Sequence, residues 1–387
     1  MKALVASAQW APRKDYPLTD KEIKAKRANC GSQVWRSPVF EIKDIAAPDV
    51  GVDEVLIRVK RSGICGSDTH LYETDEEGYI IFSGPVKLPC IIGHEYSGIV
   101  EKTGRSVYNF NIGDKVAAES ILWCGVCTTC RSGAVNQCER VELAGITSHG
   151  AFAEYIVAKE RHCWNINDFT DIYSDENDLF DAGALIEPAG CAYNGIFISG
   201  GGFNPGAVVT VFGAGPIGLA AVGLARTAGA SLIIAFDLIE QRLDIAKKMG
   251  ADLAFNLSRS DFSAGEEILG LTKGRGADLQ VEAAGDARST IPEMEKSLAP
   301  NGKIVYLGRA ATSSKMHLNP LVSGANKLIG SRGHSGYGIY HNIIKLISSG
   351  RLDLGQIITS HFSFDDLQEG LKKSSDRSDG KIMIDIS

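Results

Sequence analysis

Three side chains with different donor atoms, Cys65, His94 and Glu95, stand in two short motifs, Gly-Ile-Cys-Gly-Ser-Asp and Gly-His-Glu. They offer a thiolate, an imidazole and a carboxylate, which are ligands that Zn²⁺ accepts in proteins. Three protein ligands with one position left for water or substrate are typical of a catalytic zinc site. A single histidine before a strand also occurs as a buried structural residue. On spacing alone, both interpretations stay open.

A second group of cysteines lies in a turn-rich segment with the spacing C-x2-C-x2-C-x7-C. Its members are Cys124, Cys127, Cys130 and Cys138. Four thiolates this close can surround one Zn²⁺ completely, which is typical of a structural site that keeps a lobe folded. A redox C-x-x-C pair would not need four cysteines, and disulfides are disfavoured in a chain that is not secreted. An iron–sulfur cluster is the main alternative to zinc.

The third motif is Gly-Ala-Gly-Pro-Ile-Gly, which lies between an apolar run at 208–212 and a helix-like pattern. Its candidate cofactor-binding residues are Gly213, Gly215, Pro216, Ile217 and Gly218. A second apolar run, 232–236, ends on Asp237, 19 residues after Gly218. In such a β-α-β unit, helix N-terminal amides hold a pyrophosphate and the acidic residue binds ribose hydroxyls. A purely structural glycine turn is the alternative.

The charges around Asp237 indicate which dinucleotide binds. Its carboxylate would repel a 2′-phosphate, and Glu240 adds a second negative charge. Arg242 is the nearest cation, and a surface ion pair or a stack on the adenine suits it better than phosphate recognition. The sequence therefore predicts NAD, with Arg242 among the candidate cofactor-binding residues.

Length and composition restrict the class of protein. A chain of 387 residues is long enough for two domains, each with its own core. The net charge of -7 argues against a nucleic-acid partner, because phosphate contacts need a basic face. Neither a membrane-spanning apolar run nor a signal-peptide pattern is found. We therefore expect a cytoplasmic protein without membrane or nucleic-acid partners.

Two kinds of secondary structure must position these motifs. Strand-like runs dominate the first part and predict an antiparallel sheet, whereas strands and helices alternate from residue 205 in the doubly wound manner. The polar segment 11–36 reads as a surface excursion without an assigned function. We expect a catalytic domain at 1–188 and 340–387, which includes the cysteine lobe at about 119–140, and a nucleotide-binding domain at 189–339.

Glu187 lies at the crossing between these domains, after an apolar run and before Pro188. It is a candidate carboxylate for a cleft. The alternative is a glutamate in the first turn of a helix, where the helix dipole favours a negative charge.

In combination, the motifs resemble the zinc-dependent medium-chain dehydrogenase/reductase superfamily, and most closely its polyol branch. The resemblance covers nearly the whole chain and is carried by residues 63–68, 93–95 and 186–188, the cysteine lobe and the glycine motif at 213–218. Two further segments, Thr74–Ile80 and Gly333–Gly338, together with the 11–36 excursion, look like an inositol-catabolic member of this branch.

The resemblance implies a GroES-like domain, a Rossmann domain, NAD, two Zn²⁺ per chain and a homodimer or homotetramer. It also implies that Glu187 is a further zinc ligand or reaches the substrate. Our hypothesis is that hydride passes between NAD and a secondary alcohol of a polyol or cyclitol, while Ser67 passes the hydroxyl proton out through the ribose hydroxyls or towards His70. The alternatives are a zinc enzyme of aminocyclitol or amino-alcohol metabolism and, from another class, a non-catalytic zinc-stabilised binding protein.

Overall fold

The structure is a computed structural model that describes residues 1–258, 262–309 and 313–386. The chain forms two compact units. Unit 1 comprises Met1–Glu187, Ser360–Arg377 and Ile382–Ser387, and unit 2 comprises Pro188–Thr359 and Ser378–Lys381. Within the described residues, no helix has both the length and the apolar character needed to cross a membrane.

The boundary between the units corrects one prediction. The sequence places Pro188, residues 340–359 and residues 378–381 in the catalytic domain, but all of them belong to unit 2. Residues 340–359 pack against helix α6 (Pro216–Thr227): the Thr227 hydroxyl donates a hydrogen bond to the carbonyl of Arg351, and Leu352 lies against Gly223. These contacts connect residues far apart in the sequence, so no local pattern shows them.

Unit 1 is built around a seven-stranded sheet in which β3 is central. Strand β3 (Glu54–Ile64) pairs antiparallel with β5 (Glu95–Thr103), β9 (Tyr155–Lys159) and β18 (Lys381–Asp385). The remaining strands of this sheet are β6 (Lys115–Ala118), β10 (Cys163–Asn165) and β17 (Ile358–Ser363). Most side chains of β3 are buried, which accounts for its apolar composition.

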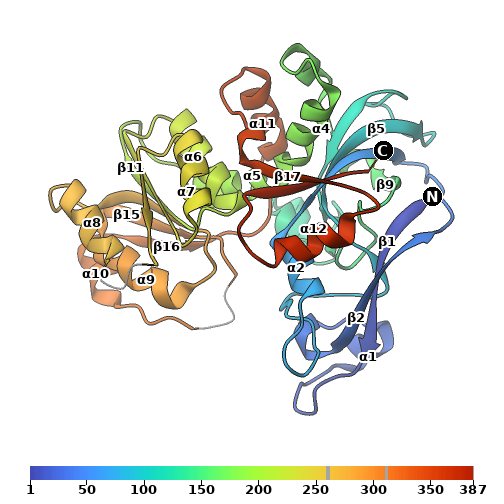
Figure 1. Ribbon diagram of the computed structural model, residues 1–387, viewed down its shortest axis with the longest axis horizontal. Coiled ribbons are helices and arrows are strands. Elements are labelled where there is room, and N and C mark those ends of the chain that lie inside the picture. The colour runs from blue at the N-terminus through green and yellow to red at the C-terminus, as the bar shows by residue number, and fades with distance from the viewer. Residues whose placement is uncertain (259–261, 310–312, 387) are drawn as a thin grey trace. The chain divides into compact units, whose positions relative to one another are not determined.

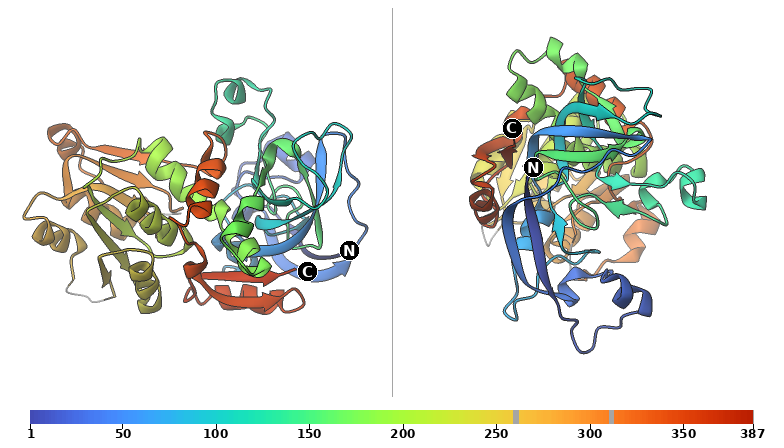
Figure 2. Two further views of the ribbon diagram at one scale, coloured as in Figure 1. Left: turned by 90° about the horizontal axis from the view of Figure 1, so that it is seen from above. Right: turned by 90° about the vertical axis from the view of Figure 1, so that its right-hand side faces the viewer.

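Smaller elements surround this sheet. A three-stranded sheet contains β1 (Lys2–Trp10), β2 (Trp35–Asp44) and β4 (Cys90–Ile91). The cysteine lobe contains α3 (Thr128–Arg131) between β7 (Ile121–Leu122) and β8 (Glu142–Leu143), and it projects from unit 1 (Figure 2). The helices outside the lobe are α1 (Asp20–Ala25), α2 (Gly66–Tyr72), α4 (Glu176–Ala184) and α12 (Leu367–Ser374).

The predicted excursion at 11–36 contains α1 and is attached to the loop that follows α2. Gly31 N–H donates to the carbonyl of Gly84 at 2.8 Å, and Ser32 N–H donates to the carbonyl of Phe82 at 2.9 Å. Ala28 within the excursion is fully buried. The excursion is therefore packed against unit 1 along this loop.

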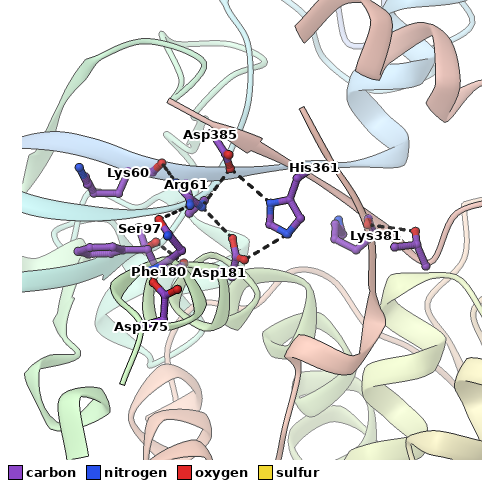
Figure 3. A network of polar contacts seen from close by, with 11 residues as sticks. Lys60, Arg61, Ser97, Asp175, Phe180, Asp181, His361, Lys381 and Asp385 are labelled. Atoms are coloured by element: carbon purple, nitrogen blue, oxygen red, sulfur yellow. Dashed lines mark hydrogen bonds and ion pairs between the residues drawn. The ribbon is translucent and has the colours of Figure 1, made fainter. Parts of the chain in front are cut away.

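A network of ion pairs joins the C-terminal strands to the rest of unit 1 (Figure 3). Arg61 Nε on β3 lies 3.1 Å from Asp181 Oδ1 and 3.2 Å from Asp385 Oδ1. The ring of His361 on β17 contacts the same two carboxylates at 3.4 and 3.3 Å. Asp181 belongs to α4, which ends three residues before Glu187. The network thus holds the segment that leads to this candidate carboxylate.

Unit 2 contains a six-stranded parallel sheet of order β13-β12-β11-β14-β15-β16. Helices α6 and α7 contact each other on one face of this sheet, and helices α8 and α9 contact each other on its other face (Figure 1). The strands are β11 (Val208–Phe212), β12 (Leu232–Asp237), β13 (Leu253–Asn256), β14 (Ala277–Glu282), β15 (Leu298–Tyr306) and β16 (Lys327–Gly330). The other helices are α5 (Ile186–Tyr193), α7 (Glu240–Lys248), α8 (Ala264–Leu271), α9 (Ala287–Lys296), α10 (Leu318–Ser323) and α11 (Ile339–Ser348). This order confirms the predicted Rossmann-type domain.

Candidate functional site

The three predicted ligands of the first site come together in unit 1. The thiol of Cys65, a ring nitrogen of His94 and a carboxylate oxygen of Glu95 all lie within 4.8 Å of one another. Cys65 follows β3 directly and stands at the N-cap of α2, whereas Glu95 is the first residue of β5. Because β3 and β5 pair with Gly63 opposite Glu95, the sheet register brings the two motifs together.

Two glycines make room for this arrangement. A Cβ on Gly63 would lie 2.2 Å from Glu95 Oε2, so any side chain there would displace the carboxylate. Gly93 has a φ of 87°, and a Cβ on it would lie 2.7 Å from the Phe152 ring. The turn before His94 therefore needs glycine for both its conformation and its space.

Asp68 is a site residue to which the sequence reasoning assigns no role. It is fully buried, its Oδ2 accepts a hydrogen bond from Cys65 N–H at 2.9 Å, and its Oδ1 lies 3.5 Å from His94 Nδ1. A carboxylate on Nδ1 orients the ring and leaves Nε2 for a metal. The Ser67 hydroxyl lies 3.3 Å from that Nε2. The sequence signal for Asp68 is its place three residues after Cys65 in the same Gly-Ile-Cys-Gly-Ser-Asp motif.

The electrostatics of this site favour a cation. Burial by itself lowers the pKa of His94, but the Asp68 carboxylate and the Cys65 thiol outweigh it and raise the pKa well above its usual range. Surroundings that hold a proton on a buried imidazole stabilise positive charge. Because the donors are sulfur, nitrogen and oxygen, the residues fit a zinc ion.

Two other predicted catalytic residues, Glu187 and His70, do not belong to this donor group. Glu187 is not among the mutually close donors found in the described residues, and its Oε1 accepts a hydrogen bond from Ser120 Oγ at 3.0 Å. His70 lies three residues after Ser67 on α2. Burial, and next the nearby Arg377, lowers the pKa of His70. A proton route from Ser67 to His70 stays a prediction.

The four lobe cysteines form a second donor group. Their sulfur atoms lie within 4.8 Å of one another. Cys138 Sγ accepts hydrogen bonds from the backbone N–H groups of Cys124 and Arg140 at 3.4 and 3.3 Å. Backbone N–H donors from Val126 and Cys127 lower the pKa of Cys124 to about 6. None of the nine cysteines, all of which lie in the described residues, forms a disulfide, so the four sulfurs remain available as donors and the set fits one zinc ion.

His162 at the base of the lobe gives the chain a predicted sensitivity to acid. Burial, and next the charge of Arg161, lowers its pKa to about 4, whereas the unfolded value is about 6.5. Between these values the unfolded chain binds the extra proton, so stability falls as the pH falls. We expect this residue to account for a loss of about 2 kcal/mol in the free energy of unfolding between pH 7 and pH 5.

Urea unfolding at pH 7 and pH 5 checks this expectation. His162→Gln should remove most of this pH dependence, whereas His317→Gln, whose side chain is exposed, should leave it unchanged. The same loss in the free energy of unfolding between pH 7 and pH 5 in His162→Gln and in the unsubstituted protein would contradict this expectation.

The glycine motif of unit 2 has the geometry that a pyrophosphate site needs. Gly213 has a φ of 92°, and a Cβ on Gly218 would lie 1.8 Å from the carbonyl oxygen of Gly213. A Cβ on Gly215, at the N-cap of α6, would meet nothing within 4 Å. The outer glycines therefore allow a tight turn and close packing, while the middle one keeps the helix N-terminus open.

Asp237 stands at the end of β12 and holds the same loop. Its Oδ2 accepts a hydrogen bond from Ala214 N–H at 2.6 Å, and its Oδ1 accepts one from Ile239 N–H at 2.9 Å. Arg242 on α7 donates from Nε to the carbonyl of Asp379 at 2.8 Å. The roles of Asp237 and Arg242 toward a dinucleotide stay predictions, and the structure adds that Asp237 orders the glycine turn.

Fold and sites together define a two-domain dehydrogenase with a dinucleotide motif in one unit and two metal-ligand groups in the other. Residues 51–168 match the family model of the alcohol dehydrogenase GroES-like domain, and residues 216–349 match that of the zinc-binding dehydrogenases. The chain belongs to the zinc-dependent alcohol dehydrogenase family and is an oxidoreductase. These matches confirm the predicted GroES-like and Rossmann domains.

Individual relatives agree with this family. The chain is 36% identical over 396 residues to scyllo-inosose 3-dehydrogenase of Thermotoga maritima, covering 99% of each chain. It is 32% identical over 363 residues to L-threonine 3-dehydrogenase of an Anaeromyxobacter species, covering 94% of this chain and 97% of the relative. A solved structure from Thermotoga maritima named as an alcohol dehydrogenase matches with a TM-score of 0.95, 36% identity and full coverage of both chains. The first relative confirms the resemblance to an inositol-catabolic member.

Proposed function

We propose that this oxidoreductase transfers hydride between NAD and a secondary alcohol of a polyol or cyclitol, of the inositol or inosose class. The observation that carries the proposal is the convergence of Cys65, His94 and Glu95 within 4.8 Å, with Asp68 behind the imidazole. The identity of 36% to scyllo-inosose 3-dehydrogenase over 99% of the chain supports the substrate class.

The chain's own residues have distinct roles in this proposal. Cys65 Sγ, His94 Nε2 and a Glu95 oxygen hold the zinc ion, and Asp68 orients His94. When bound, zinc supplies a Lewis acid that favours loss of the alcohol proton, and NAD supplies the hydride acceptor. We assign to the Ser67 hydroxyl, which lies 3.3 Å from His94 Nε2, the role of receiving the proton of the alcohol.

Later proton movement and substrate orientation involve residues outside the donor group. His70, three residues after Ser67 on the same helix, passes the proton toward solvent. Glu187, whose carboxylate is buried, contacts the substrate or the metal. Together these residues bind the alcohol, orient it and remove its proton, while the carbinol hydrogen leaves with its electron pair.

A substrate panel tests the function. The reduction of NAD and NADP at 340 nm is followed with inositols, inososes, linear sugar alcohols and L-threonine, and the reverse reaction with inososes and NADH. We expect the highest kcat/KM with an inositol or inosose. Threonine as the best substrate would replace the cyclitol assignment with the amino-alcohol alternative, which the L-threonine 3-dehydrogenase relatives favour. A zinc-loaded protein that transfers no hydride with any compound would contradict the function as a whole.

Cofactor choice gives a separate prediction for Asp237→Ala. The variant lacks the hydrogen bonds from Ala214 and Ile239 to the Asp237 carboxylate, which weakens the binding of both cofactors. It also lacks the proposed contact between the carboxylate and the ribose hydroxyls, which affects only NAD. We expect the Kd for NAD to rise about tenfold more than the Kd for NADP. Calorimetric titration of both cofactors measures this ratio, with Asp244→Ala, whose exposed side chain lies on α7, as the control. An equal loss for both cofactors would remove Asp237 from cofactor selection.

Cytoplasmic location, a homodimeric or homotetrameric assembly and the absence of nucleic-acid partners stay predictions. Size-exclusion chromatography with light scattering measures the assembly directly.

A further inference from the structure

The strongest unassigned feature is a buried polar connection between the cysteine lobe and Glu187, within unit 1. Ser120 and Glu187 are 6% and 8% exposed, and the Ser120 hydroxyl donates to Glu187 Oε1 at 3.0 Å. A hydrogen bond to a buried carboxylate is stronger than one between neutral groups and fixes the direction of the acceptor. Ser120 therefore restricts where the carboxylate of Glu187 points.

Ser120 is itself held by the residue before it. Glu119 is 2% exposed, and its two oxygens accept hydrogen bonds from two indoles, Trp123 Nε1 at 2.9 Å and Trp164 Nε1 at 3.0 Å. The backbone is held as well, because Glu119 N–H donates to the carbonyl of His162 at 2.8 Å and the carbonyl of Ser120 accepts from Ala144 N–H at 2.9 Å. A buried carboxylate is costly unless it is well bonded, so this arrangement favours one geometry.

One of the two indoles belongs to the stem of the lobe. Trp123 immediately precedes Cys124, the first cysteine of the second donor group. Its ring packs edge-on against His162 at 5.2 Å, and the Arg161 guanidinium lies 5.5 Å from its centroid. A shift of the lobe therefore moves an indole that is bonded to Glu119.

We propose that Ser120 is a positioning residue for Glu187, and that Glu119, clamped by Trp123 and Trp164, couples the cysteine lobe to that position. The lobe thus acts on the reaction through a path of contiguous side chains, in addition to its structural role. This inference rests on the proposed function, because it assigns Glu187 a part in turnover.

The first test compares Ser120→Ala with Ser120→Thr and with Ser132→Ala. Ser132 is an exposed lobe serine whose hydroxyl donates to the carbonyl of Thr129. Ser120→Ala should lower kcat about tenfold to a hundredfold with a smaller change in KM. Ser120→Thr, which keeps the hydroxyl, should recover most of kcat, and Ser132→Ala should match the unchanged protein. Thermal melting measures stability in parallel. A Ser120→Ala protein that turns over like Ser132→Ala, or a loss that Ser120→Thr does not recover, overturns the positioning role.

The second test addresses the coupling to the lobe. Trp123→Phe removes one donor to Glu119, and it should lower kcat less in the Ser120→Ala background than in the unchanged protein. Additive losses, or no loss from Trp123→Phe alone, overturn the coupling.

A third measurement does not depend on turnover or on the folding of the Ser120 variants. Glu119→Gln places an amide N–H₂ against an indole N–H, so tryptophan emission should shift to longer wavelength, whereas exposed Glu139→Gln should not change it. A Glu119→Gln spectrum identical to that of the unsubstituted protein overturns the clamp.

The outcomes separate the inference from the proposed function. If the unsubstituted protein oxidises no alcohol, the proposed function fails and the role of Ser120 in turnover fails with it, while the spectrum still decides the clamp. If that protein is active and Ser120→Ala turns over normally, only the inference fails.

Discussion

Cys65→Ala is expected to lower kcat for alcohol oxidation by about a thousandfold or more. The substitution removes the only sulfur donor of the group that also contains His94 and Glu95. Two remaining donors bind zinc weakly, and without the metal the alcohol keeps its proton, which is worth several kcal/mol in the barrier. The glycine motif lies in the other unit, so the Kd for NAD should change little.

Steady-state kinetics, NAD titration and metal analysis of one preparation check this prediction. Cys30→Ala is the matched control, because Cys30 belongs to neither donor group. The unchanged protein should contain two zinc ions per chain and Cys65→Ala one. Full activity in Cys65→Ala would remove the metal from the chemistry. A single zinc per chain in the unchanged protein would favour the alternative of a zinc-stabilised binding protein.

Loss of one lobe thiolate should lower the stability of the protein. Cys127→Ala opens the four-sulfur group, and it also removes the acceptor for Cys130 N–H at the start of α3. A lobe with two short strands and a one-turn helix has little apolar core of its own, so its folding depends on the metal. We expect Cys127→Ala to lower the free energy of unfolding by about 4 kcal/mol or more.

Calorimetric melting with metal analysis separates this effect from the effect of Cys65→Ala. Cys127→Ala should lose the lobe zinc and lower Tm, whereas Cys65→Ala should lose the other zinc with a smaller change in Tm. A chelator should reproduce the Tm loss in the unchanged protein but not in Cys127→Ala. An unaltered Tm in Cys127→Ala would show that the lobe does not need its metal. Iron in place of zinc would identify the cluster alternative.

Local motifs were sufficient for the chemistry that the sequence predicts. The donor types at 65, 94 and 95, the four spaced cysteines and the glycine motif with Asp237 are each properties of a short segment. Periodicity separates the antiparallel part from the alternating part for the same reason, because strand and helix patterns are local. The two-domain fold and the family therefore follow from the chain alone.

Contacts between segments far apart in the sequence determined which residues orient the candidate ligands and where the domain boundary lies. Asp68 becomes the partner of His94 only because the pairing of β3 with β5 brings residues 26 apart in sequence within 3.5 Å. Glu119 meets Trp164 across 45 residues, and Ser120 meets Glu187 across 67. Residues 340–359 join unit 2 through their packing against α6. Strand register and buried hydrogen-bond partners depend on the whole packed core, so the residues that orient the candidate ligands became visible only in the tertiary structure.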